Sequence, residues 1–144
     1  MVSTVLLLGS SACGDSTGPE VDRLNEQRSL WEAAGLQDYT YDVRRVCFCP
    51  FREDGARLTV VGGTLTGATD ISTGEALESS EVQWYHTIEG LFDLIQDAYD
   101  RDAHSVHVDF DTNRGYPIMI FIDYSEMIAD EELGFTLLSE VQPL

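Results

Sequence analysis

One segment with helical periodicity, residues 87–99, constrains the fold of this chain most strongly. Thr87 can accept a hydrogen bond from the first turn and so begin a helix. The apolar residues that follow repeat at the i, i+3, i+4, i+7 spacing of an amphipathic helix, at Ile88, Leu91, Phe92, Ile95, Ala98 and Tyr99. The segment predicts a helix that covers one face of a sheet, with strands before and after it.

A second helix is predicted over residues 19–34. Pro19 suits the first helical turn, and Gly35 suits the left-handed position that ends a helix. Leu24, Trp31 and Ala34 would form its apolar stripe.

Between the two helices the apolar pattern changes to the alternation of strands. Tyr39, Tyr41 and Val43 alternate with polar residues, after which the apolar positions shift by one to Val46 and Phe48. The shift predicts either a β-bulge near residues 44–45 or a strand covered on both faces. Residues 58–61 and 64–68 predict a hairpin turned by Gly62-Gly63, and residues 72–84 predict a loop.

Three further strands are predicted after the second helix, at residues 106–110, 117–122 and 133–141. The expected order is therefore αβββαβββ. We predict a single α+β domain over residues 19–144, a two-layer sandwich in which two helices cover an antiparallel sheet of about five to six strands. A chain of 144 residues is long enough for one such core.

The N-terminus resembles the export signal of bacterial lipoproteins. An apolar stretch and small residues lead to Cys13, and a short polar segment follows. We predict a signal peptide at residues 1–12 and a lipidated Cys13 with a tether at residues 13–18; the alternative is a buried first strand. Because residues 1–8 carry no charge, we expect the true translation start to lie upstream of Met1.

The charge of the chain limits the classes of partner that it can bind. The chain has 26 acidic residues against 8 basic ones, a formal net charge of −18, and every basic residue is Arg. This excludes a nucleic-acid-binding role, which requires a basic surface. A body of this charge favours a cationic protein or small ligand, or divalent cations that screen it near a membrane.

Cys47 and Cys49 form the second chemical feature. With Cys13 assigned to lipid, the two remaining cysteines could form a disulfide, ligate a metal, exchange electrons or stay free. In an extended strand, residues i and i+2 lie near the ~7 Å limit for a disulfide, so a bridge would need a local turn. His86, His104 and His107 could complete a zinc or copper site, although no spacing brings them together.

A third feature, Asp109, Asp111 and Asn113, resembles the start of a calcium loop. Arg114 and Ile120 occupy the positions where an EF-hand has Gly and Glu, so a hairpin turn is the competing interpretation. The sequence contains no phosphate loop and no nucleophile elbow. We therefore expect no enzymatic activity; a reaction carried out by the carboxylates of residues 109, 111 and 130–132 is the least favoured alternative.

Several local patterns together resemble a family of small bacterial envelope proteins known only as a domain of unknown function. The resemblance covers about residues 28–142 and is carried by Tyr39-x-Tyr41, Cys47-x-Cys49, residues 87–95, Gly115-Tyr116-Pro117 and Asp130-Glu131-Glu132. Members of that family are often predicted lipoproteins and have no assigned activity. The resemblance implies an exported protein that is lipid-anchored to the cell membrane or outer membrane and faces the periplasm or exterior. We expect a binding or structural module, the alternative being a metal-handling or thiol-redox protein using Cys47 and Cys49.

Overall fold

The computed structural model describes residues 18–47, 54–128 and 131–144. Their elements are α1 (Pro19–Ala34), β1 (Tyr39–Cys47), β2 (Ala56–Val61), β3 (Thr64–Asp70), α2 (Ser79–Val82), α3 (Ile88–Asp100), β4 (Ser105–Phe110), β5 (Pro117–Asp123), β6 (Leu133–Leu137) and β7 (Gln142–Pro143). The predicted α+β class and the order αβββαβββ are confirmed. The described residues add a short third helix, α2, and a short seventh strand, β7.

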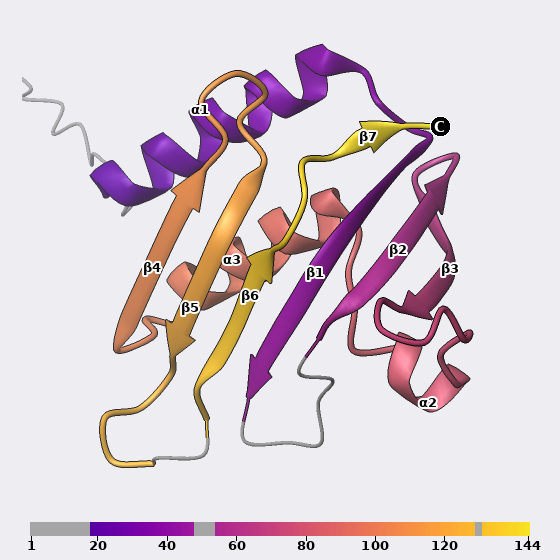
Figure 1. The fold of residues 1–144 in the computed structure, drawn as a ribbon. Helices are drawn as coiled ribbons and strands as arrows, with labels where there is room; N and C mark the ends of the chain where they lie inside the picture. The colour runs from indigo at the N-terminus through magenta and orange to yellow at the C-terminus, as the bar shows by residue number, and fades with distance from the viewer. Residues whose placement is uncertain (1–17, 48–53, 129–130) are drawn as a thin grey trace, which may run out of the picture.

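All strands join one antiparallel sheet in the order β3-β2-β1-β6-β5-β4. The short strand β7 pairs with the first residues of β1, opposite Tyr39 and Thr40. The connection that contains α3 crosses from the β3 edge of the sheet to the β4 edge. Figure 1 shows α3 behind the sheet and α1 across one end of it, and no helix of the described residues lies on the other face of the sheet. The fold is thus two layers, and β3 and β4 are the outermost strands.

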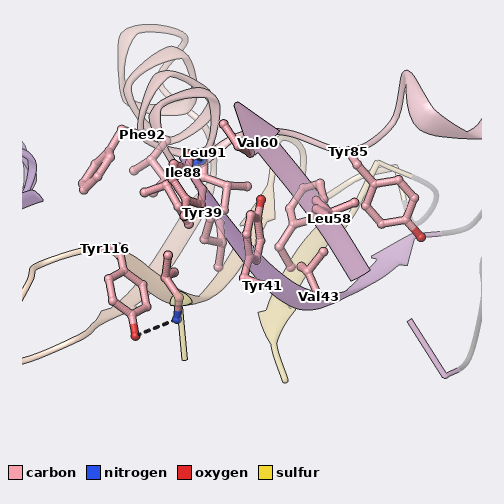
Figure 2. Packing of buried hydrophobic residues seen from close by; sticks show 14 of the residues in the cluster. Tyr39, Tyr41, Val43, Leu58, Val60, Tyr85, Ile88, Leu91, Phe92 and Tyr116 are labelled. Atoms are coloured by element: carbon pink, nitrogen blue, oxygen red, sulfur yellow. Dashed lines mark hydrogen bonds between the residues drawn. The ribbon is translucent and has the colours of Figure 1, made fainter. Parts of the chain in front are cut away.

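The core lies between the sheet and the helices. Its largest fully buried side chains are Tyr39 and Tyr41 of β1, Phe92 of α3, Phe135 of β6 and Tyr116, which precedes β5. Figure 2 shows the rings of Tyr39 and Tyr41 beside Ile88 and Leu91 of α3. Burial of this apolar area is the main force that holds the two layers together.

Helix α1 has the predicted bounds and end. Gly35 adopts φ 65° and its N–H donates to the carbonyl of Glu32, the left-handed end expected for glycine. Leu24 and Trp31 are buried as predicted, but Ala34 is exposed. The apolar stripe of α1 is therefore narrower than predicted, and Trp31 rather than Ala34 carries the contact of the last turn with the core.

The bulge predicted near residues 44–45 is wrong. β1 pairs residue for residue with β2 over Tyr39–Val43 and with β6 over Val43–Cys47. The odd-numbered side chains keep to the helix-covered face, and Val46 lies on the open face with 49% of its surface exposed. The parity shift reflects an exposed valine rather than a change in the backbone.

Two further segments differ from prediction. The loop expected at residues 72–84 contains α2, and Ala76 forms a bridge with Thr69 of β3. The last strand, expected to be continuous over residues 133–141, ends at Leu137 and resumes as β7. Val141, between the two pieces, is fully buried.

The Gly115-Tyr116-Pro117 motif joins α1 to the sheet. Gly115 has φ +75°, and a Cβ added there would lie 2.3 Å from the carbonyl oxygen of Gln27 in α1. The adjacent Tyr116 ring packs edge-on against Trp31 of α1, with 5.8 Å between ring centroids. Glycine is required here because the two backbones approach too closely for any side chain.

Candidate functional site

A groove of about 540 Å³ follows the outer edge of β4. Five successive residues of β4 line it, so it runs along the strand. The first two turns of α1 and the end of α3 form one wall, and β5 contributes one residue on the other side. The lining residues are Glu20, Arg23, Tyr99, Val106, His107, Val108, Asp109, Phe110 and Met119.

Strand alternation gives the groove two unlike sides. Val106, Val108 and Phe110 belong to the side packed against the core, whereas His107 and Asp109 are exposed on the opposite face. One side of the groove is consequently apolar and aromatic, and the other is polar.

Aromatic stacking fixes the wall next to α1. The Phe110 ring stacks on Phe92 of α3 with 6.2 Å between centroids and an interplanar angle of 16°. The Arg23 guanidinium lies over the Phe110 ring, 5.2 Å from its centroid. This cation–π contact holds the first turns of α1 over the end of β4.

The groove also has a polar interior next to α1. Burial raises the pKa of Tyr99, the neighbouring Glu20 carboxylate adds to the rise, and Arg23 opposes it. The Tyr99 phenol therefore stays neutral in its setting. Glu20 and Asp109 supply negative charge, and Arg23 supplies the positive charge that faces Phe110.

A separate network explains the Tyr39-x-Tyr41 motif. Glu89, in the first turn of α3, accepts hydrogen bonds from Trp31 Nε1 at 2.8 Å and from the Tyr39 hydroxyl at 2.7 Å. The same hydroxyl accepts the backbone N–H of Ile88 at 2.9 Å. Tyr41 donates its hydroxyl proton to the carbonyl of the residue before the Thr87 cap. These bonds join α1, β1 and α3, so the motif has a structural role.

The predicted site residues lie in separate places. Cys13 and Cys49 fall outside the described residues. Cys47 ends β1 opposite Leu133, and the Cys47–Cys49 disulfide stays a prediction. His86 packs edge-on against Phe135, with 5.4 Å between ring centroids.

The predicted calcium residues form a turn and a strand. Asp109 lies in β4 opposite Met119. The Asp111 carboxylate accepts the backbone N–H groups of Asn113 at 3.1 Å and of Arg114 at 2.7 Å. This is the hairpin turn that the sequence offered as the competing interpretation. Within residues 18–47, 54–128 and 131–144, no three His, Cys, Asp or Glu side chains are placed to hold a metal ion.

Sequence reasoning found the strand residues of the groove but not the groove itself. Glu20, Arg23, Tyr99 and Met119 come from three different elements. They meet because β4 is an outermost strand and α1 lies over its end. The helical spacing of Tyr99 was a usable signal for one of them; the position of β4 in the sheet had no local signal.

The fold and the groove together define a small α+β domain with an accessible sheet edge. No helix among its described residues is long and apolar enough to cross a membrane. The model of DUF6174, a family of unknown function, matches residues 23–143, and the chain belongs to this family. The resemblance to a domain of unknown function is thereby confirmed. Comparisons with curated proteins and with solved structures gave no match.

Proposed function

We propose that this protein is a lipid-anchored bacterial envelope protein that binds a ligand in the β4 groove without catalysing a reaction. It is exported, is held at the cell membrane or outer membrane by a lipid on Cys13, and faces the periplasm or exterior. The apolar run and small residues before Cys13 support the anchor. The groove offers a strand edge, aromatic faces and fixed charges, which suit recognition.

The observation that carries the proposal is the position of the groove relative to the anchor. Glu20, which lines the groove, stands two residues after Gly18, the end of the predicted tether. The tether reaches at most about 18 Å when extended. A lipid on Cys13 would therefore hold the groove close to the bilayer, where membrane-associated partners are concentrated.

The ligand expected from the charge is cationic. A chain of net charge −18 held near anionic headgroups is repelled by them. A basic partner, or divalent cations between the protein and the headgroups, would remove that repulsion.

Metabolic labelling with an alkyne analogue of palmitate tests the anchor. The protein is expressed from its natural gene as wild type, as Cys13→Ser and as Cys47→Ser. We expect the label in the wild type and in Cys47→Ser, and its loss in Cys13→Ser together with release from the membrane fraction. Equal labelling of all three proteins would remove the anchor from the proposal.

Amine chemistry gives an independent check of the anchor. The chain has no Lys, so a mature protein with a fully acylated N-terminal Cys13 has no primary amine. We expect it to resist an amine-specific reagent that labels the unprocessed protein. Strong labelling of the membrane form would contradict full N-acylation.

Thiol or metal chemistry at Cys47 and Cys49 is the second candidate. It is favoured by the sequence itself, because with Cys13 assigned to lipid the two remaining cysteines stand only two positions apart. Elemental analysis and thiol titration of the purified protein test it. Absence of bound metal, with an unchanged fold on replacing both cysteines by Ser, would refute this candidate.

A further inference from the structure

We propose that the β4 groove binds an extended peptide segment of alternating basic and apolar residues, which adds to the sheet as a strand beside β4. The proposal names the partner class for the binding role proposed above and rests on that role. Three independent observations support the proposal: the shape of the groove, the difference in hydrogen bonding between the two edges of the sheet, and the distribution of charge.

The groove has the shape of a strand site. It is lined by the five successive residues from Val106 to Phe110, so its long axis follows the strand. β4 keeps a regular register with β5 from Ser105 to Asp109, and the irregularity comes after Asp109. An undistorted edge of this length, roughly 16 Å, can form a ladder with an incoming strand.

The two edges of the sheet differ in the backbone hydrogen bonds that they make. At β3, the carbonyl of Ala68 accepts the N–H of Leu77 and the N–H of Asp70 donates to the carbonyl of Glu75, both at 2.9 Å. Residues 75–77 thus occupy the outer edge of β3 at residues 68–70. In the part of the chain that the structure describes, no backbone hydrogen bond reaches β4 from any element except β5.

Natural sheets protect their exposed edges because unpaired N–H and C=O groups attract other strands. β3 carries such cover at residues 68–70, whereas no described segment hydrogen-bonds to the outer edge of β4, which has the groove beside it. An unprotected edge next to a preformed groove is the arrangement used by proteins that recognise peptides by strand addition.

The side chains of the groove specify the sequence of the added strand. Alternate residues of that strand would face the apolar side formed by Val106, Val108 and Tyr99, and the remaining ones would face Asp109 and His107. Apolar residues satisfy the first set of contacts and basic residues satisfy the second. The net charge of −18 attracts such a segment over a distance and opposes pairing of two copies of this chain through β4.

Binding of a designed peptide to the full chain tests the proposal. The probe is fluorescein-labelled Arg-Val-Arg-Val-Arg-Val, blocked at its C-terminus, and binding is followed by fluorescence anisotropy. Two N-methylated versions carry methyl groups on alternate amides, one set for each edge of the peptide. A version with Glu in place of Arg has the same strand pattern and the opposite charge.

We expect the Arg peptide to bind and one N-methylated version to lose at least tenfold in affinity, because the methyl groups remove the donors that face β4. The other N-methylated version and the parent peptide should bind alike, and the Glu peptide should bind at least tenfold more weakly. Equal binding of both N-methylated versions and the parent would overturn strand addition and leave only electrostatic attraction. Two other results would also overturn strand addition of a peptide. One is absence of binding, and the other is a dimer of this chain that dissociates when Asp109 is replaced by Asn.

A matched pair of variants locates the site. Asp109→Asn and Glu75→Gln change the net charge equally, but Asp109 lines the groove and Glu75 lies at the β3 edge. We expect Asp109→Asn to weaken binding of the Arg peptide about two- to fivefold and Glu75→Gln to leave it unchanged. Equal effects would place the peptide elsewhere.

The same assay on Cys13→Ser separates this inference from the anchor. Binding that persists in Cys13→Ser while acylation is absent from the wild type would refute the anchor alone. Failure of the peptide to bind either protein, with acylation of Cys13 intact, would refute strand addition alone.

Discussion

Removing the hydroxyl of Tyr39 should destabilise this protein far more than removing that of Tyr41, although both tyrosines are fully buried neighbours on one strand. The Tyr39 hydroxyl makes two hydrogen bonds, one to the Glu89 carboxylate and one from the backbone N–H of Ile88. The Tyr41 hydroxyl donates one, to the carbonyl of His86. The two Phe variants therefore differ in hydrogen bonding and hardly in volume.

The magnitudes follow from these bonds. Loss of a bond to a charged group costs about 1.5–3 kcal/mol, and a buried N–H left without an acceptor costs about 1–3 kcal/mol. Because Glu89 is half-buried, the lower ends of these ranges apply, and we expect about 2.5 kcal/mol for Tyr39→Phe. Tyr41→Phe loses one neutral bond, about 1 kcal/mol.

Urea unfolding followed by circular dichroism measures both costs. For a domain of this size, these losses correspond to falls in Tm of roughly 10 °C for Tyr39→Phe and 4 °C for Tyr41→Phe. A double-mutant cycle of Tyr39→Phe with Glu89→Gln should show coupling, because the two groups share a bond. Equal losses for the two tyrosines, with no coupling to Glu89, would refute the role given to this network.

Three further predictions follow from single residues. Burial raises the pKa of Tyr41 well above 10.0, so above pH 10 the unfolded chain loses a proton that the folded chain keeps. The free energy of unfolding should therefore fall as pH rises, by up to about 1.4 kcal/mol per pH unit, and less steeply in Tyr41→Phe. Burial and then Arg45 lower the pKa of His86 below 6.5, so stability should fall as pH drops from 7 to 5, and His86→Gln should flatten that slope in urea unfolding. Gly115→Ala should cost about 3 kcal/mol or more, because its Cβ would collide with Gln27 as well as strain the backbone. Gly35→Ala, which has open space around it, should cost about 1 kcal/mol. Similar costs for the two variants would contradict the close approach at Gly115.

Local signals were enough to predict the two long helices, α1 and α3, and one hairpin. The ends of α1 follow from Pro19 and Gly35, and the start of α3 follows from Thr87, whose side chain accepts the N–H of Gly90 at 3.1 Å. The Gly62-Gly63 turn has positive φ at both residues, as a tight hairpin requires. Each of these features is decided by residues within a few positions of one another.

The apolar pattern misleads where an apolar residue of a strand does not enter the core. Val46 is exposed on the open face of the sheet, so the shift of pattern in β1 marked no bulge. Arg45, at the position predicted for the distortion, lies on the helix-covered side with its guanidinium 5.1 Å from the Trp84 ring centroid. A long side chain can cover the apolar layer with its stem, which the binary pattern does not reveal.

The position of β4 decides where the candidate site lies, and it depends on contacts distant in sequence. β1 pairs with β6, about ninety residues away, which places β5 next to β6 and leaves β4 at the edge. Had β4 paired with β1 instead, Asp109 and His107 would lie in mid-sheet and no groove would form beside α1.

The edge position of β4 also determines where a charged partner would bind. With the lipid anchor that we propose at Cys13, the acidic body would be repelled from anionic headgroups and held at the end where α1 begins, so it would gain most from a partner that brings positive charge to that end. A basic strand added to β4 would do this, because it would place its cations beside Asp109 and next to the first turns of α1.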